Sequence, residues 1–280
     1  MRRACVIGWP IEHSRSPLIH GYWLRRYGID GAYDRQPVRP DNAGEFLRTL
    51  AMRSLVGCNV TVPHKEVAFR VADEKDKSAV AVGAANTVWL DGGRLCCANT
   101  DTYGYMTHLT LRAPNWKKRD APVSILGAGG AARAIIYGFL SAGVAKVRVF
   151  NRTRERAEAL AKHFGPAVEV ADWSDRSTLS KDAAVIVNTT TIGMKDEGTL
   201  DIDFTGFHPD CVVSDIVYVP LETGFMAAAR EQGLTVVDGL GMLLHQAVPG
   251  FERWFGLRPT VTPALRALIE DDILAKSVAK

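Results

Sequence analysis

The sequence predicts an α/β protein with two domains, one of which is a doubly wound parallel sheet. Six short β-rich runs alternate with helical segments between residues 123 and 239, and their strands are nearly all apolar, as in strands covered on both faces by helices. Residues 1–103 instead mix strands, helices and a hairpin, and the chain is helical again from residue 240. We therefore expect one domain made of residues 1–103 and 240–280, with the C-terminal helices packing back on it, and a second domain of residues 104–239.

The elements of the first domain are predicted by apolar alternation, helical spacing and turn residues. Ser16 and Pro17 open a helix that runs to residue 28, with Ser16 as the N-cap and Pro17 at the first helical position. Asp91-Gly92-Gly93 forms the turn of a hairpin within residues 86–101. Strands are expected at residues 3–8, 32–38 and 57–62, and a further helix at residues 42–52.

The second domain begins after a polar, basic and proline-bearing segment, residues 111–122. Its β-rich runs are residues 123–127, 146–151, 167–172, 184–190, 211–218 and 235–239. Helical segments between them include residues 154–164 and 221–233, and two more helices follow at residues 242–256 and 262–276. This alternation is the pattern of a parallel, doubly wound sheet.

Composition excludes several classes of protein. The 280 residues are 47% hydrophobic and carry a net charge of +3 that is spread along the chain, so no nucleic-acid partner and no basic membrane patch are expected. No apolar run approaches the roughly 20 residues of a membrane span, and Pro10 and Glu12 come too early for a signal peptide. The five cysteines are an odd number without zinc-site spacing, which favours reduced thiols, a cytoplasmic location and no metal.

A glycine-rich turn joins the first strand of the second domain to a helix. The sequence is Gly127-Ala128-Gly129-Gly130-Ala131-Ala132, which fits G-x-G-x-x-A in the strand–turn–helix context that the motif requires. Gly127 permits the tight turn, and Gly129 lets backbone amides approach a pyrophosphate at the helix N-terminus. We therefore expect a Rossmann-type dinucleotide site at residues 127–131.

The end of the next strand indicates which dinucleotide binds. NAD sites usually place Asp or Glu here to accept the ribose 2′-hydroxyl, but this chain has Asn151-Arg152-Thr153 followed by Arg154 and Arg156. Cations at a helix N-terminus oppose the helix dipole, so they need another reason to be there. Arginines suit a 2′-phosphate, and the pattern favours NADP, with Arg152 and Arg156 as the better candidates and Arg154 as surface charge.

Several motifs in order resemble the shikimate dehydrogenase family nearly end to end. They are PIEHSRSPLIH (10–20), NVTVPHK (59–65), GAANT (83–87), NTDTYG (99–104), the glycine-rich turn, NRT (151–153), NTTTIGM (188–194), DIVYVPLET (215–223) and DGLGMLLHQA (238–247). Trp9, Gly21, Ala85 and Lys77 depart from the family's usual residues. The resemblance implies NADPH-dependent, reversible reduction of 3-dehydroshikimate to shikimate in the chorismate route to aromatic amino acids.

The resemblance also implies the site residues. Lys65 is the expected proton relay and Asp101, at the end of a hairpin strand, its partner; a structural ion pair is the plainer alternative. Ser14 and Ser16 would bind the substrate carboxylate, and His64 is read as structural. The other expected substrate residues are Asn59, Thr61, Asn86, Tyr218 and Gln246. The expected cofactor residues are Gly127, Ala128, Gly129, Gly130, Ala131, Asn151, Arg152, Thr153, Arg156, Thr189, Ile216, Gly239 and Met242.

Three other functions stay open. A quinate or dual quinate/shikimate dehydrogenase would often use NAD, against which Arg152 argues. A non-catalytic shikimate-binding regulator would not need Lys65 and Asp101. A glutamyl-tRNA reductase with the same cofactor domain would need a reactive cysteine and a tRNA-binding surface, and neither is evident. The chain is expected to act on small molecules alone, as a monomer or homodimer.

Overall fold

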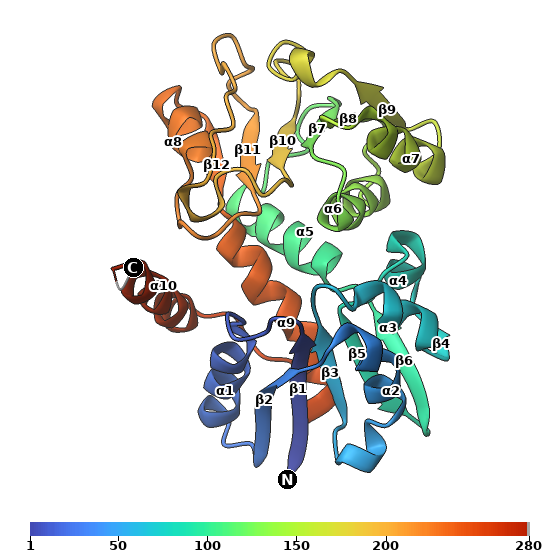
Figure 1. The fold of residues 1–280 in the computed structure, drawn as a ribbon. Coiled ribbons are helices and arrows are strands. Elements are labelled where there is room, and N and C mark those ends of the chain that lie inside the picture. The colour runs from blue at the N-terminus through green and yellow to red at the C-terminus, as the bar shows by residue number, and fades with distance from the viewer. Residues whose placement is uncertain (279–280) are drawn as a thin grey trace. The chain divides into compact units, whose positions relative to one another are not determined.

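The computed structural model describes residues 1–278, and the chain divides into two compact units (Figure 1). Unit 1 comprises Met1–Tyr103 together with the chain from Leu244 onward, and unit 2 comprises Gly104–Leu243. Both divisions fall inside helices, α5 (Asp101–Arg112) and α9 (Gly239–Phe255), so these two helices contribute residues to both units. No helix within residues 1–278 is long and apolar enough to cross a membrane.

Unit 1 is built on a mixed six-stranded sheet. The strands are β1 (Arg2–Gly8), β2 (Gly31–Pro37), β3 (Gly57–Val60), β4 (Glu74–Lys75), β5 (Thr87–Asp91) and β6 (Arg94–Ala98), in the order β2-β1-β3-β5-β6-β4. β1 runs parallel to β2 and β3, whereas β3–β5 and β5–β6 are antiparallel. The predicted hairpin is confirmed, since Gly92 and Gly93 turn between β5 and β6 with φ of 55° and 81°, a region that glycine enters without strain.

Helices cover this sheet and close its core. They are α1 (Ser16–Arg26), α2 (Ala43–Arg48), α3 (Lys65–Val71), α4 (Lys77–Val82), α10 (Pro263–Val278) and the unit 1 part of α9, with short 3₁₀ turns at Pro40–Asn42 and Ala51–Arg53. Trp254 of α9 donates from Nε1 to the carbonyl of Val88, 3.0 Å away. Gly57 lies directly under that indole, where a Cβ atom would collide with it. The C-terminal helices therefore pack on the first unit, as predicted.

Three local predictions are corrected by the structure. The N-cap of α1 is Arg15 rather than Ser16, and it is the hydroxyl of Ser14 that accepts from the Ser16 amide, at 3.3 Å. The strand predicted at residues 57–62 ends at Val60, and Lys65 is the first residue of α3. Asp101 does not end a hairpin strand, because β6 stops at Ala98 and Asp101 begins α5. The first correction moves a cap by one residue, within the usual spread of helix ends, and in the other two a helix begins a few residues after a strand ends.

Unit 2 is a six-stranded parallel sheet. Its strands are β7 (Val123–Leu126), β8 (Val147–Phe150), β9 (Val168–Ala171), β10 (Val185–Asn188), β11 (Val212–Asp215) and β12 (Thr235–Val237). The order is β12-β11-β10-β7-β8-β9, and every neighbouring pair is parallel. The six predicted β-rich runs and the doubly wound sheet are confirmed.

The chain order of unit 2 fixes where a ligand can approach the sheet. From β7 the chain moves outward through β8 to β9, then returns to β10 beside β7 and moves the other way to β12. Ligands of open α/β sheets bind at the carboxyl ends of the strands, at this switch in direction. The helices α6 (Gly130–Ser141), α7 (Arg154–Phe164) and α8 (Gly224–Glu231) follow β7, β8 and the loop after β11, and 3₁₀ turns lie at Trp173–Asp175 and Met194–Asp196.

Candidate active site

Lys65 lies at the start of α3, five residues after the last residue of β3. The carbonyl of Lys65 accepts a hydrogen bond from the Ala85 amide at 2.9 Å, which fastens this turn to the segment before β5. The preceding residue, His64, is fully buried, and its Nε2 lies 2.7 Å from the carbonyl of Val38. A carbonyl can only accept, so this contact places a proton on Nε2 and occupies it. His64 is thereby turned into the protein, away from a role as a freely exchanging acid.

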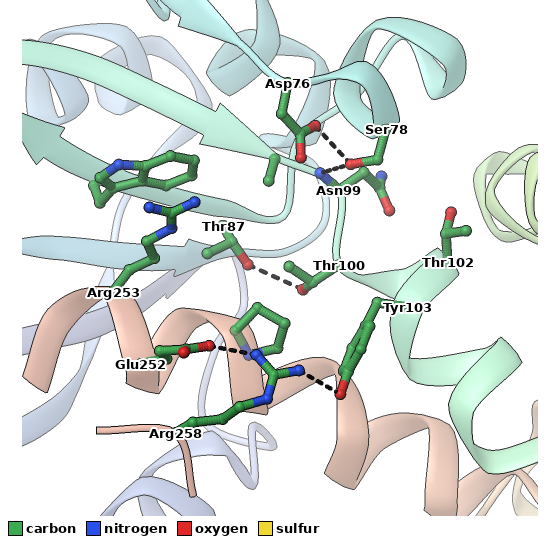
Figure 2. Close-up of a pocket in the computed structure, with 13 residues that line it drawn as sticks. Asp76, Ser78, Thr87, Asn99, Thr100, Thr102, Tyr103, Glu252, Arg253 and Arg258 are labelled. Carbon is green, nitrogen blue, oxygen red and sulfur yellow. Dashed lines mark hydrogen bonds and ion pairs between the residues drawn. The ribbon is translucent and has the colours of Figure 1, made fainter. Parts of the chain in front are cut away.

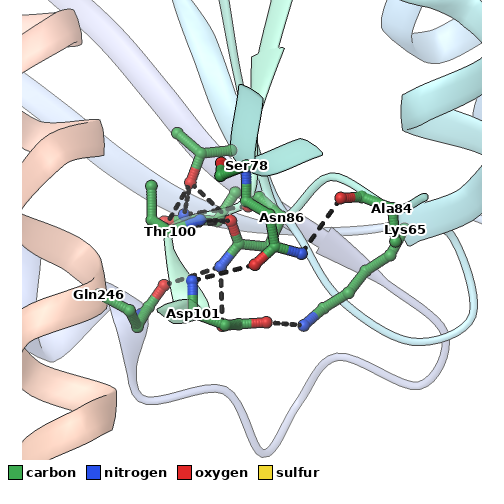
Figure 3. Close-up of polar contacts among 10 residues, drawn as sticks. Lys65, Ser78, Ala84, Asn86, Thr100, Asp101 and Gln246 are labelled. Carbon is green, nitrogen blue, oxygen red and sulfur yellow. Dashed lines mark hydrogen bonds and ion pairs between the residues drawn. The ribbon is translucent and has the colours of Figure 1, made fainter. Parts of the chain in front are cut away.

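Lys65 and Asp101 form a short ion pair (Figure 3). Nζ of Lys65 lies 2.6 Å from Oδ2 of Asp101, and the two side chains keep 32% and 13% of their accessible surface. Asp101 is also in the first turn of α5, where the helix dipole favours a carboxylate. A charge-assisted bond of this length between half-buried groups is stronger than an ordinary surface pair. The lysine ammonium is therefore held at one position while part of it stays accessible.

The other oxygen of Asp101 is bound by Asn86, which lies just before β5. Nδ2 of Asn86 donates to Oδ1 of Asp101 at 2.8 Å and to Oε1 of Gln246 on α9 at 3.3 Å. Figure 3 shows the three side chains converging with Lys65 from four different segments. Asn86 and Gln246 are 3% and 8% exposed. The site thus combines one cation with one carboxylate and two amides, a set that suits a ligand rich in hydroxyl groups.

Two threonines and a second asparagine support Asn86 from behind. Oδ1 of Asn86 accepts from the amide of Thr100 at 2.8 Å and from the hydroxyls of Thr100 and Thr87 at 3.1 and 3.2 Å. Asn59 of β3 donates from Nδ2 to Oγ1 of Thr87 at 3.2 Å and to the carbonyl of Asn86 at 3.2 Å. Its Oδ1 accepts from the hydroxyl of Tyr33 at 2.6 Å. Both polar atoms of the Asn59 carboxamide therefore bind protein groups.

A cavity of about 690 Å³ lies on the far side of these threonines (Figure 2). Thr87 and Thr100 contribute to its lining, together with the aromatic rings of Trp89 and Tyr103. Arg258 on this wall is held by Glu252 and by the hydroxyl of Tyr103. The lining of this cavity therefore includes both threonines that bind the Asn86 carboxamide.

The segment of Ser14 and Ser16 is held by two arginines. Arg35 donates from Nε and Nη2 to the carbonyl of Ser14 at 3.0 and 2.6 Å. Arg15 is 9% exposed and donates from Nε to Oδ2 of Asp272 on α10, at 2.9 Å. Ser16 is buried, and Ser14 is partly exposed. The turn that carries both hydroxyls is therefore fixed from β2 on one side and from α10 on the other.

The remaining expected substrate residues are divided between the units. Thr61 follows β3, and its amide donates to the carbonyl of Ile7 at 2.9 Å. Gly8 beside it has no room for a side chain, since a Cβ would lie 2.6 Å from Cγ2 of Thr61. Tyr218 follows β11 in unit 2 and is half-buried. The structure brings Ser14, Ser16, Asn59, Thr61, Lys65, Asn86, Asp101 and Gln246 into unit 1, and leaves Tyr218 in unit 2.

The glycine-rich turn of unit 2 has the space that a bound pyrophosphate needs. Gly127 has φ of 109°, and a Cβ there would lie 2.7 Å from Oγ1 of Thr189, which follows the neighbouring strand β10. A Cβ on Gly129 or Gly130 would meet nothing within 4 Å, so the backbone at the start of α6 faces open space. This combination of a strained turn, an open backbone and a helix N-terminus fits a dinucleotide phosphate.

One close backbone contact joins the segments that follow β11 and β12. Gly239 approaches the carbonyl of Ile216 so closely that any Cβ would overlap it. Ile216 and Met242 are partly buried and pack against the core of the sheet. Ile216 and Gly239 thus meet at the edge where a parallel sheet binds its ligand, whereas Met242 contributes to the core at least in part.

The arginines after β8 differ in their partners. Arg154 is engaged by Glu158 and Asp172, which accounts for it as surface charge. Arg152 and Arg156 are exposed and make no ion pair with any carboxylate in the described part of the chain. Arg152 lies over the ring of Trp173, 5.8 Å from its centroid, and Asn151 turns its Nδ2 to the carbonyl of Thr153 at 2.7 Å. Two guanidinium groups are thus available to an anion at the end of β8.

Sequence reasoning did not find the residues that support the site. Thr87 and Thr100 are each adjacent in sequence to an expected residue, and that adjacency was the available signal. No sequence signal indicated Tyr33, Arg35 or Asp272. These residues lie on a distant strand or on the C-terminal helix, and only the fold brings them to the site.

Family models and relatives identify the family of this chain. Residues 6–88 match the shikimate dehydrogenase substrate binding domain, residues 111–194 the shikimate / quinate 5-dehydrogenase family, and residues 239–269 the shikimate 5′-dehydrogenase C-terminal domain. A curated relative from Azorhizobium caulinodans, shikimate dehydrogenase (NADP(+)), is 52% identical over 276 residues, which cover 99% of this chain and 98% of the relative. The chain belongs to the shikimate dehydrogenase family.

Solved structures of the shikimate dehydrogenase family share the whole fold. Shikimate 5-dehydrogenase from Thermus thermophilus, solved with NADP(H) and shikimate, superimposes with a TM-score of 0.85 at 33% identity, covering 98% of this chain and 99% of that one. Quinate dehydrogenase from Corynebacterium glutamicum, solved with NAD, gives 0.87 at 29% identity, covering 96% and 99%. The fold therefore accommodates both specificities, and residues must distinguish them.

Proposed function

We propose that this chain is an NADP-dependent shikimate dehydrogenase, which reversibly reduces 3-dehydroshikimate to shikimate on the route to chorismate and the aromatic amino acids. The observation that carries the proposal is the Lys65–Asp101 pair in unit 1, which is held by Asn86; Asn86 also donates to Gln246. The curated relatives at 52% identity bear the name of this activity. Residues 1–103 and 240–280 serve as the substrate domain in this account, and residues 104–239 as the cofactor domain.

Lys65 moves the proton in the proposed mechanism. When the substrate carbonyl is reduced, its oxygen becomes an alkoxide that needs a proton, and the Lys65 ammonium both stabilises that charge and donates the proton. In the reverse direction, neutral Lys65 accepts the proton of the substrate hydroxyl. Asp101 holds Nζ in place at 2.6 Å and keeps its charge balanced. Bound NADPH supplies the hydride.

The other expected residues bind and orient the ligands. Ser14 and Ser16 donate hydroxyl protons to the substrate carboxylate, and Thr61, Asn86, Asp101, Tyr218 and Gln246 contact the hydroxyl groups of the ring. The turn at residues 127–131, with Thr189, Ile216, Gly239 and Met242, holds the dinucleotide backbone and the nicotinamide. Arg152 and Arg156, with Asn151 and Thr153, bind the 2′-phosphate; their lack of carboxylate partners within residues 1–278 supports this assignment.

Quinate dehydrogenase is the second candidate, because a quinate enzyme with bound NAD has the same fold. Asn151 follows β8 at the position where NAD-binding sites usually have Asp or Glu, so the sequence disfavours NAD as the cofactor. Initial rates with shikimate and with quinate, each with NADP⁺ and with NAD⁺, separate the two. We expect shikimate with NADP⁺ to give the highest kcat/KM. Comparable efficiency with quinate and NAD⁺ would contradict the proposal, and binding of shikimate without turnover would favour a regulator.

We also infer that the enzyme works in the cytoplasm, without nucleic acid, as a monomer or homodimer. All five cysteines are buried free thiols, as suits a reducing compartment. Sedimentation of the purified chain over a range of concentrations measures the oligomeric state directly, and any assembly larger than a dimer would contradict this part of the proposal.

A further inference from the structure

We propose that Tyr33 and Asn59 are positioning residues, which set the orientation of the Asn86 carboxamide and through it the Asp101–Lys65 pair. The inference rests on the proposed function of that pair. Asn59 was expected to bind the substrate directly. In this proposal it acts instead through Thr87 and Asn86. One continuous series of hydrogen bonds inside unit 1, here called the tyrosine chain, joins Tyr33, Asn59, Thr87, Asn86, Asp101 and Lys65.

The tyrosine chain begins at a buried hydroxyl that keeps its proton. Tyr33 is 7% exposed, and burial raises the pKa of its phenol well above 10, so the hydroxyl keeps its proton. Its ring stacks on His20, with centroids 4.0 Å apart and planes inclined by 15°. Burial lowers the pKa of His20 to about 3, so the stacked imidazole is neutral. The Tyr33 hydroxyl therefore has a fixed place and a fixed role as donor to Oδ1 of Asn59.

The carbonyl of Asn86, which can only accept, and the Tyr33 hydroxyl, which donates, together decide which way the Asn59 amide faces. With Oδ1 bound to Tyr33, Nδ2 must face the carbonyl of Asn86 and Oγ1 of Thr87, which are both acceptors for it. The reversed amide would set its oxygen against the carbonyl of Asn86 and would take away the acceptor of the Tyr33 hydroxyl. A buried amide placed that way loses its hydrogen bonds and their stabilisation.

Thr87 passes this orientation on to Asn86. A hydroxyl has one proton, and since Thr87 accepts from Asn59, that proton is available to Oδ1 of Asn86 or to Thr100. The Thr100 amide donates to the same Oδ1. Nδ2 of Asn86 is then directed at Asp101, whose second oxygen binds Lys65. The tyrosine chain thus connects the buried Tyr33 hydroxyl to the Asn86 carboxamide, and through Asp101 to Lys65.

Isosteric variants test the tyrosine chain. Tyr33→Phe keeps the ring on His20 and removes the hydroxyl; Thr87→Val keeps the volume and removes the hydroxyl; Thr87→Ser restores it. Because small displacements of a catalytic group cost much in rate, we expect Tyr33→Phe and Thr87→Val each to lower kcat with shikimate about tenfold, while KM for NADP⁺ stays unchanged. The pH profile of kcat/KM should shift in both, and Thr87→Ser should recover most of the rate. The double variant should lose less than the product of the two single losses, since both act on Asn59.

The matched control is Tyr105→Phe, which removes a buried phenol from unit 2, outside the tyrosine chain. A purely structural role for Tyr33 would lower the melting temperature and leave kcat and its pH profile as in the wild type, and that result would overturn the inference. The side-chain amide signal of Asn86 in ¹⁵N spectra provides a readout without turnover. It should move in Tyr33→Phe and Thr87→Val but not in Tyr105→Phe; an unmoved signal refutes the positioning role, whereas a wild-type chain inactive on shikimate refutes the proposed function.

Discussion

Nζ of Lys65 and Oδ2 of Asp101 lie 2.6 Å apart, although their Cα atoms belong to two different helices, each at its first residue. Both helices begin where a strand has just ended, after β3 and after β6. A helix start leaves backbone amides unpaired and favours a nearby carboxylate, which suits Asp101. Lys65 has no such benefit from its own helix, so its place depends on Asp101. Neither segment alone forms the pair, because it depends on the fold that brings the two helix starts together.

Arg152 and Arg156 should decide the choice of cofactor. Replacing both with alanine removes two guanidinium groups that have no carboxylate partner in the described chain. A charge-assisted hydrogen bond contributes about 1.5–3 kcal/mol, so KM for NADP⁺ should rise by roughly 10- to 100-fold or more. KM for NAD⁺, which has no 2′-phosphate, should hardly change.

Arg154→Ala is the matched control for that experiment. Arg154 stands in the same helix start but is already engaged by Glu158 and Asp172. Its loss should leave KM for NADP⁺ within about twofold, because the pairs it makes are exposed and weak. A rise in KM for NADP⁺ with Arg154→Ala, together with little effect of the double replacement, would reassign the phosphate site.

Asp272 should matter for the substrate although it lies on the C-terminal helix. Asp272 forms an ion pair with Arg15, which stands between Ser14 and Ser16 in the sequence. The Asp272→Asn variant weakens this contact, so we expect a several-fold rise in KM for shikimate with no change in KM for NADP⁺. Loss of a hydrogen bond between charged groups should also lower the free energy of unfolding by about 2 kcal/mol. Asp271→Asn, at the exposed neighbouring position, is the control. Equal effects of the two replacements would mean that α10 does not hold the serine turn.

The acid stability of unit 2 should depend on Asp215. Burial raises the pKa of this carboxyl from 3.8 to about 6, against the opposing hydrogen bonds from Val217, Thr223 and Asn188. The native state therefore binds the proton more tightly than the unfolded chain between pH 3.8 and about 6. The contribution of Asp215 to stability is greatest below that window and falls as the pH rises through it. A shift of about 2 units corresponds to about 3 kcal/mol.

Urea unfolding of Asp215→Asn and wild type across this window measures that contribution. The difference in the free energy of unfolding should change by about 2 kcal/mol in favour of the variant between pH 4 and pH 6.5, since part of the full change lies outside this range. Asp210→Asn replaces an exposed carboxylate on the same unit and is the control. A difference that stays constant with pH for Asp215→Asn would contradict the raised pKa.

The sequence was sufficient for the sheet of unit 2 and for the glycine-rich turn. Six short apolar runs that alternate with helical segments are typical of buried parallel strands, and Gly127 with φ of 109° has a backbone conformation that other residues rarely adopt. The hairpin at Gly92 and Gly93 was predictable for the same reason. These features are local, since each is decided by residues within one turn or one strand.

The short helices were not predictable in the same way. α3 and α4 have seven and six residues, too few for a helical period to emerge. The start of α5 was missed because NTDTYG follows a strand closely. Gly104, Tyr105, His108 and Leu109 do show the spacing of one buried helical face. The support of the site by Tyr33 and Asp272 depends on contacts between distant segments, which no local pattern contains.

The most direct test of the account is the rate of the Lys65→Met variant. Methionine keeps the length of the side chain and removes its proton and charge. If Lys65 is the proton relay, single-turnover reduction of 3-dehydroshikimate with bound NADPH should slow by about 10²- to 10⁴-fold. The dissociation constant of shikimate should change much less, and Lys75→Met, which removes an exposed lysine of β4, should react like the wild type. A Lys65→Met enzyme that retains most of the wild-type rate would contradict the central claim.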